Sequence, residues 1–289
     1  MSTAELVPPA VVRAPARVSS RLLRSELGMI FRRRRNQAIL LVLALIPVVI
    51  GVAIRVASPA PDESGDGPPF LFSIAGNGIF VALTALTVVL PLFLPLAVSV
   101  VSGDSVAGEA GLGTLRYLLV VPVSRARVLL VKYAGAVAYC LVAALLVGAV
   151  GVGLGALLFP VGPVTLLSGT TVSLADGIVR LLLVALYVAA MMAGLAAIGL
   201  FVSTLTESSI AAMATTSVLA VLSQVLGSVP QISWLHPWLF SHYWLNYGDL
   251  LRDPVATDGV ARGLLATAAY VLVFGLAAWA RLTTKDVSS

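Results

Sequence analysis

Six long stretches of this chain carry no charged residue. Arg35 and Arg55 enclose 19 uncharged residues, and Lys132 and Asp176 enclose 43. A helix needs about 20 mostly apolar residues to cross a bilayer. The chain is 59% hydrophobic and only 11% charged, whereas soluble domains carry about 25% charged residues. The spacing of charges therefore predicts an all-α polytopic membrane protein.

The uncharged stretches divide into six predicted transmembrane helices within a membrane domain of residues 36–282. Gly and Pro at positions 160–163 end the third helix, and the SGTT sequence at 168–171 argues against a seventh. Residues 1–16 lack periodicity and predict a disordered tail, and residues 283–289 form a C-terminal tail. The predicted spans cover 37–57, 78–102, 131–159, 178–203, 208–227 and 263–281.

Six spans place both termini on one side of the membrane. With the termini in the cytoplasm, the inner segments hold 14 of the 18 Lys and Arg residues. Cytoplasmic segments of membrane proteins are enriched in Lys and Arg. We therefore expect a multi-pass protein of the cell membrane with both termini cytoplasmic. The net charge of +5 follows from this topology and gives no reason to expect nucleic-acid binding.

Residues 17–35 predict a basic amphipathic helix on the inner membrane face. Arg21, Arg24, Arg32 and Arg35 share one arc of the helix, and the rest is apolar except for Glu26. Such a helix binds the anionic headgroups of membrane lipids. The alternative is an ordinary positive anchor with no further role.

An aromatic segment, Ser228–Tyr247, precedes the last predicted span. Trp and Tyr favour the headgroup zone, and Pro230 and Pro237 break a helix, so we expect short re-entrant helices in the outer leaflet. His236 and His242 also lie here. Two His residues with no third ligand nearby indicate interfacial side chains more than a metal site.

The sequence contains no recognisable motif for catalysis, ATP hydrolysis or ion coupling. It lacks the G-x-x-x-x-G-K-[ST] phosphate loop, every acid falls at a span end or in a loop, and no catalytic grouping is evident. Cys140 is the only cysteine. We therefore expect neither an enzyme nor a bound cofactor, and a source of energy outside this chain.

The tract Gly103–Lys132 lies in the predicted cytoplasmic segment between spans two and three. We expect span two to end at Ser102 and Asp104 or Ser105 to cap a following helix. Gly111 and Gly113 break or tighten the chain, and Pro122 ends the short amphipathic helix that starts at Thr114. A short helix parallel to the membrane can transmit the movement of a cytoplasmic partner to the two spans that it connects. The alternative is a plain charged loop.

The tract reads E-x-G-L-G-T-L-R-Y-L-L-x-x-P-V-S-R over residues 109–125. Together with the layout of spans, it resembles the membrane subunits of ATP-binding cassette (ABC) exporters of the type-2 permease family. The resemblance implies a coupling helix, within Gly103–Arg125, that docks on a separate nucleotide-binding subunit where ATP and Mg bind. It also implies a second permease copy, identical or related. The implied coupling residues are Asp104, Glu109, Gly113, Thr114, Leu115, Arg116, Pro122 and Arg125, with Glu207 as a second contact.

Hydroxyl residues on two predicted spans form the candidate translocation path. Ser209, Thr216 and Ser223 recur at heptad spacing on the fifth span, and Thr84 and Thr87 lie on the second. The alternative is close helix packing with hydroxyls bonded to carbonyls. We interpret the Gly151-x-x-x-Gly155 pair on the third span as packing only. An uncharged path suits a hydrophobic or amphipathic cargo such as a drug, an antibiotic or a lipid.

Two other function classes stay open from the sequence. One is the membrane component of a metalloprotein-maturation or lipid-processing system, which only His236 and His242 favour. The other is a non-transporting scaffold or sensor for an ATPase, which would share the tract but lack a path. Substrate flux separates the scaffold from an exporter.

Overall fold

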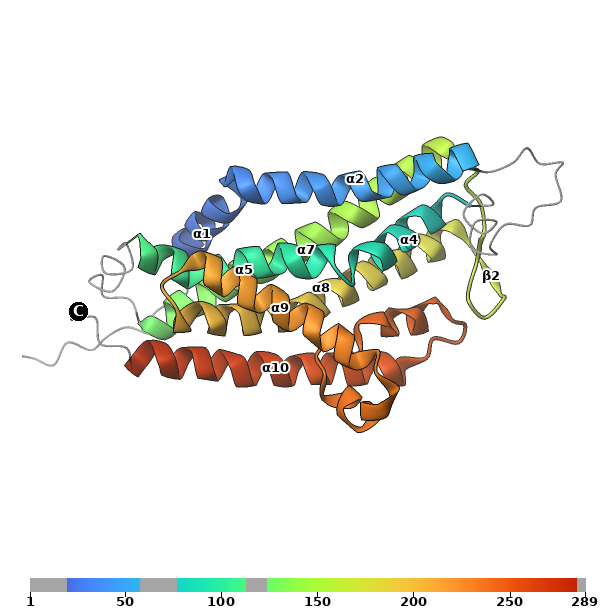
Figure 1. Cartoon of the computed structure of the whole chain (residues 1–289). Coiled ribbons are helices and arrows are strands. Elements are labelled where there is room, and N and C mark those ends of the chain that lie inside the picture. The colour runs from blue at the N-terminus through green and yellow to red at the C-terminus, as the bar shows by residue number, and fades with distance from the viewer. Residues whose placement is uncertain (1–19, 58–76, 113–123, 285–289) are drawn as a thin grey trace, which may run out of the picture.

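The computed structural model describes residues 20–57, 77–112 and 124–284. These residues form an elongated bundle of helices that run side by side (Figure 1). Two short 3-10 helices and one small hairpin complete the described fold. The elements are α1 (Ser20–Arg32), α2 (Arg34–Ala57), α4 (Ile79–Val89), α5 (Phe93–Gly111), α7 (Arg125–Leu158), β1 (Val164–Thr165), β2 (Thr171–Val172), α8 (Leu174–Leu205), α9 (Ser209–Gly227), η1 (Pro230–Trp238), η2 (Trp244–Leu251) and α10 (Thr257–Thr284).

Five of the described helices, α2, α7, α8, α9 and α10, are long and apolar enough to cross a membrane. The pair α4 and α5 passes the same test together and raises the number to six. The predicted all-α polytopic class is therefore confirmed. The described chain starts and ends at the same end of the bundle, with α1 and the end of α10 on opposite sides of it (Figure 1).

The second predicted span is bent. We expected one continuous helix over residues 78–102, but α4 and α5 meet at 57° across the break between Val89 and Phe93. Pro91 and Pro95 explain the break, because proline has no N–H to donate and its ring clashes with the preceding turn. The side-chain amide of Gln224, on α9, donates to the carbonyl oxygen of Pro91.

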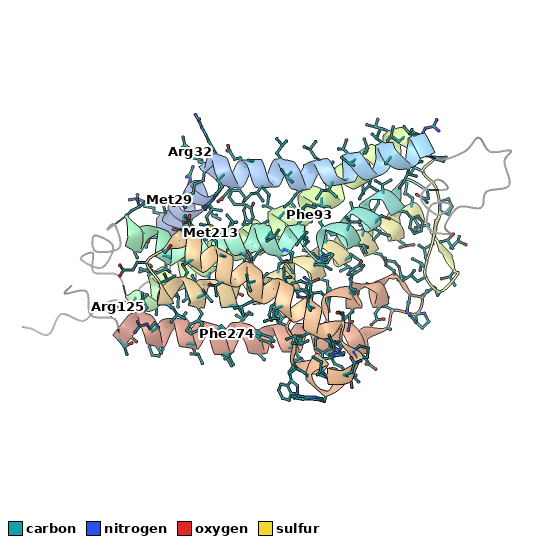
Figure 2. The ribbon with its side chains drawn as sticks, in the orientation of Figure 1. Met29, Arg32, Phe93, Arg125, Met213 and Phe274 are labelled. Atoms are coloured by element: carbon teal, nitrogen blue, oxygen red, sulfur yellow. The ribbon has the colours of Figure 1, made fainter. Side chains whose placement is uncertain are left out.

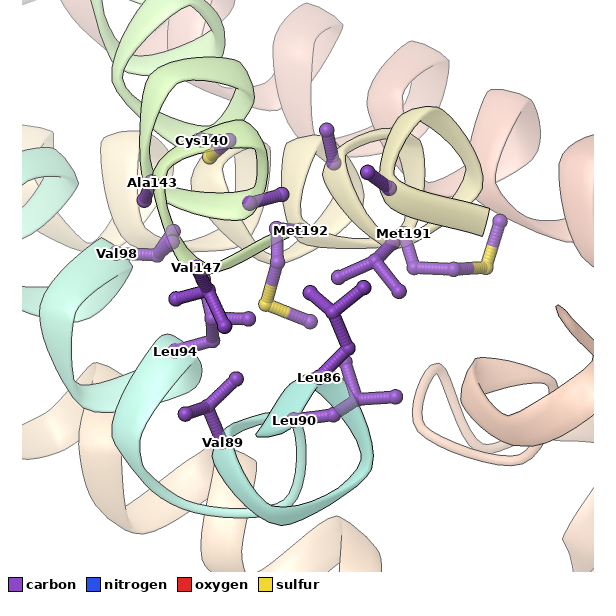
Figure 3. Close-up of a cluster of buried hydrophobic side chains, with 14 of the residues drawn as sticks. Leu86, Val89, Leu90, Leu94, Val98, Cys140, Ala143, Val147, Met191 and Met192 are labelled. Carbon is purple, nitrogen blue, oxygen red and sulfur yellow. The ribbon is translucent and has the colours of Figure 1, made fainter. Parts of the chain in front are cut away.

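Helix α8 is the centre of the bundle. Most of its apolar stretch is buried, whereas α10 is largely exposed, and α8 packs against α5, α7 and α10. Figure 3 shows where α4 and α5 meet α7 and α8. The labelled side chains there are Leu86, Val89, Leu90, Leu94, Val98, Cys140, Ala143, Val147, Met191 and Met192.

Glycines allow α7 to touch α4 backbone to backbone. A Cβ at Gly151 would lie 2.5 Å from the Cα of Ala82, and one at Gly155 would overlap the carbonyl of Gly78. Small residues permit this close approach between apolar helices. The packing interpretation of this glycine pair is confirmed.

The segment between α7 and α8 is not helical, as expected. β1 and β2 pair antiparallel, with Val164 opposite Val172, and Gly169 turns the chain at φ +83°, a conformation that favours glycine. In the aromatic segment, α9 ends at Gly227 and Pro230 opens η1, whereas Pro237 lies inside η1 instead of ending it.

Candidate functional site

The predicted tract contributes residues to one end of the bundle. The end of α5, the start of α7, the start of α9, α1 and the end of α10 gather there (Figure 1). Of the tract, residues 103–112 and 124–132 are described. Helix α5 runs through Asp104 to Gly111, so the expected helix end at Ser102 and the expected cap at Asp104 or Ser105 are wrong.

Asp104 is buried, with 7% of its surface exposed. Its carboxylate accepts hydrogen bonds from Arg33, from Arg35 at 2.8 Å and from the hydroxyl of Ser209. Arg33 stands between α1 and α2, Arg35 on α2 and Ser209 on α9. A buried carboxylate stays ionised only when it is paired and hydrogen-bonded. Asp104 therefore ties three segments to α5.

Lys132 on α7 is 3% exposed and lies between two carboxylates. Its Nζ donates to Glu109 Oε1 at 2.6 Å and lies 3.5 Å from Glu26 Oε1. Burial raises the pKa of Glu26, the Lys132 ammonium opposes that shift, and the nearby Glu109 charge adds to it. Because burial outweighs the ammonium, Glu26 holds its proton more readily than an exposed carboxyl group does.

We call these six charged residues the ion-paired cluster: Glu26, Arg33, Arg35, Asp104, Glu109 and Lys132. They come from α1, the α1–α2 junction, α2, α5 and α7. With every side chain ionised the three acids and three bases balance. Removing one partner of a buried pair is strongly destabilising because it leaves a charge uncompensated. The cluster therefore joins these helix ends into one mechanical unit.

Close packing joins the neighbouring helices to this unit. The hydroxyl of Ser203 on α8 donates to the carbonyl of Gly103 and accepts from the amides of Val106 and Ala107. A Cβ at Gly103 would lie 2.8 Å from the backbone nitrogen of Met213, so α5 and α9 touch along their backbones. Met213 and Arg125 mark this end of the molecule in Figure 2.

The residues that the resemblance implies for coupling lie in different environments. Asp104 and Glu109 point into the cluster, and Arg125 donates to the carbonyls of Leu282 and Thr283 at the end of α10. Glu207 is exposed. Five residues lie outside the described part of the chain: Gly113, Thr114, Leu115, Arg116 and Pro122.

A surface groove of about 600 Å3 lies beside the cluster. Arg34, Gly111 and Leu112 line one part of it, and Glu207 and Ile210 line another. The predicted second contact thus faces the end of α5 across one groove. The groove combines charge with exposed apolar side chains, since Leu112 is 75% and Ile210 is 78% exposed.

Four of the five candidate path residues, Ser209, Thr216, Ser223 and Thr87, form hydrogen bonds within the described chain. Thr216 is buried and donates to Ala212 O, and Ser223 hydrogen-bonds Ser241 at 2.7 Å. Thr87 bonds Tyr247 at 2.6 Å, whereas Thr84 is half-buried. The bond of Thr216 to a carbonyl matches the helix-packing alternative, and none of these contacts tests transport.

The two histidines lie side by side in the aromatic segment, with ring centroids 6.1 Å apart. Burial, then the neighbouring His236, lowers the pKa of His242. No group of three potential metal-ligating residues occurs within residues 20–57, 77–112 and 124–284.

Sequence reasoning missed the partners of the tract. Arg33 and Arg35 were assigned to the basic anchor, and Ser203 was not singled out. The signal for Glu26 was present: a lone acid interrupts the apolar face of a basic helix. An ionisable residue on such a face marks a partner on a neighbouring element.

Comparison with protein families matches residues 37–288 to a family described as "Protein of unknown function (DUF2705)". This match covers most of the chain, and the chain belongs to that family. A comparison with curated proteins finds no match.

Proposed function

We propose that this chain is the membrane-spanning subunit of an ATP-driven ABC exporter, powered by a separate ATPase. The cargo is a hydrophobic or amphipathic compound such as a drug, an antibiotic or a lipid. In this proposal two copies, identical or related, form the transporter, and ATP and Mg bind in the partner subunit. The sequence resemblance of the tract is the starting point, and the described structure adds a mechanical argument.

The ion-paired cluster is the observation that carries the proposal. An ATPase bound at the tract must move several helices together, since the displacement of one loop alone would not reach the other helices. Asp104 and Lys132, both buried, connect α5 to α1, α2 and α7 through ion pairs and to α9 through the hydroxyl of Ser209. Packed elements with buried ion pairs resist independent movement. A force applied beside Gly111 would therefore reach four other helices.

The groove beside the cluster is the proposed docking face for the ATPase. It is lined by Arg34, Leu112, Glu207 and Ile210, at the end of the molecule that we assign to the cytoplasm. The bias of Lys and Arg toward that end supports the orientation. In this orientation α1 lies at the inner membrane face, and η1 and η2 form the re-entrant helices of the outer leaflet.

Charge reversals at one groove residue and at one residue of the tract outside the described structure test the proposal. The chain is co-expressed with ATPases encoded beside it, and the complex is captured through this chain. Arg34→Glu and Arg116→Glu should each abolish capture of the ATPase, because rim charges fix binding orientation and rate. Arg262→Glu is the matched control, since Arg262 is also exposed and lies near the start of α10, far along that helix from the end beside the cluster. Capture unaffected by both reversals would refute the docking face.

Transport itself needs a second measurement. Proteoliposomes holding the complex should export a fluorescent amphipathic compound only with ATP. The isolated chain should not hydrolyse ATP. A complex that hydrolyses ATP but moves no compound from a broad panel would favour the scaffold alternative.

A further inference from the structure

An apolar groove of about 460 Å3 runs between α7, α8 and α10, apart from the cluster. Helices α7 and α10 each pack along α8 and touch each other little, so α8 forms the floor. Leu130 on one wall is 64% exposed and Leu276 on the other is 55% exposed. All three helices are long and apolar enough to cross a membrane. The groove therefore opens sideways, toward lipid.

A glycine keeps this groove open. A Cβ at Gly275 would meet no atom within 4 Å, so the space above it is empty of protein. The lining residues of α10 run from Val271 to Trp279, about 12 Å at a rise of 1.5 Å per residue. The hydroxyl of Tyr133 is already satisfied, because it donates to the carbonyl of Ala193. The groove is therefore apolar along its length, and its walls leave the Tyr133 hydroxyl in no need of a hydrogen bond from a ligand.

Three arginines lie on α7 and α10 next to one end of the groove. Arg125 donates to the carbonyls of Leu282 at 2.7 Å and Thr283 at 3.0 Å, one turn beyond Trp279. The same two helix ends carry Arg127 and Arg281, and neither the first turn of α7 nor the last turn of α10 holds an acid. The Nε of Arg127 is buried with no hydrogen-bond partner among the described residues.

We propose that this groove binds an anionic phospholipid. One acyl chain lies between α7 and α10 on the floor of α8, and the phosphate lies at the Arg127 end. Burial of hydrocarbon against apolar side chains and the fit of guanidinium to phosphate supply the two parts of the affinity. Basic sites between transmembrane helices on the cytoplasmic side suit anionic headgroups. The proposal is independent of the exporter function and concerns the chain alone.

Native mass spectrometry of the purified full-length chain in detergent tests it. The chain is titrated with phosphatidylglycerol, and separately with phosphatidylcholine. Wild-type chain should retain phosphatidylglycerol at least about tenfold more tightly, equal to about 1.4 kcal/mol. Gly275→Leu should remove this preference by filling the groove. Gly153→Leu is the matched control, because a Cβ at Gly153 on α7 also meets no atom within 4 Å, and it should bind as wild type.

A second variant separates the headgroup from the chain. Arg127→Gln should lower phosphatidylglycerol binding to the phosphatidylcholine level and leave the unfolding temperature unchanged. Equal binding of the two lipids to wild type, or full binding by Gly275→Leu, would overturn the proposal. The same spectra show the oligomeric state. If Gly275→Leu dissociates a dimer and leaves the bound lipid unchanged, a second copy of the chain occupies the groove and the lipid assignment is wrong.

Discussion

The two halves of the bundle are held together by different interactions. The half that carries α1 depends on buried charges, with Asp104 and Lys132 each bound by two ionic partners. In the half that carries η1 and η2 the ion pairs are longer, with Arg180–Asp253 and Arg252–Asp249 both at 3.8 Å, and neutral hydrogen bonds such as Tyr187 to the carbonyl of Tyr243 at 2.8 Å contribute more. Loss of one partner leaves a buried charge uncompensated, whereas a neutral hydrogen bond can break without leaving such a charge. The first half is therefore built to move as a unit and the second to adjust locally.

The comparison is tested most strongly at Lys132. Lys132→Met should cost about 3–5 kcal/mol, because it leaves Glu26 and Glu109 buried without their cation. The measurement is the free energy of unfolding of the detergent-solubilised chain, followed by tryptophan fluorescence. We expect the same variant to weaken coupling to an ATPase.

A triple variant controls for lost packing at this site. Lys132→Met combined with Glu26→Gln and Glu109→Gln removes the uncompensated charges while keeping side-chain volume. It should recover more than half of the lost stability, since replacing a buried ion group by neutral residues is often close to neutral. No recovery would show that Lys132 acts through packing, and the charge argument would fail.

Asp104→Asn should have a smaller effect, about 2 kcal/mol, the scale of hydrogen bonds to a charged group. The side chains of Arg33 and Arg35 are 43% and 41% exposed, so water solvates them when the carboxylate is lost. The two buried sites thus differ in whether the remaining partners can reach water. Thermal unfolding of Asp104→Asn beside Lys132→Met measures the difference, and equal losses would contradict it.

In the half that carries η1 and η2, Tyr187→Phe removes one hydrogen bond and should cost about 1 kcal/mol. The backbone carbonyl of Tyr243 loses that partner while the aromatic ring of residue 187 keeps its packing. The same unfolding assay gives the value. A loss as large as that of Lys132→Met would mean that the two halves do not differ in how they are held.

The sequence indicated the arrangement of helices better than the connections between them. Charge spacing placed the helices because each apolar run must be long enough to cross a membrane. The same rule ended span two at Ser102, since Asp104 follows. Helix α5 nevertheless continues, because Arg33 and Arg35 neutralise that carboxylate and Ser209 donates a hydrogen bond to it. Those partners lie far away in the chain and no local pattern reveals them.

The bend between α4 and α5 had a local signal that the charge count ignored. Pro91 and Pro95 stand four apart in an apolar run, a spacing that interrupts two successive turns. The hydroxyls on α9 were recognisable as one helical face, but not which neighbour that face meets. Ser223 hydrogen-bonds Ser241, and Ser209 donates to Asp104. Both contacts depend on how the whole bundle packs.

Glu26 gives the smallest expected effect and the most selective test of the cluster. Burial raises its pKa above the usual 4.5 despite the adjacent Lys132. The native chain therefore binds a proton more readily than the unfolded chain does, and stability falls as pH rises from about 4.5 through the raised pKa. Glu26→Gln cannot titrate, so subtracting its unfolding free energy from that of wild type at each pH isolates this slope. Wild type should lose stability relative to Glu26→Gln as pH rises through that window. A slope of the opposite sign would mean that Lys132 outweighs burial, and that Glu26 is held as a fully ionised partner of the cluster.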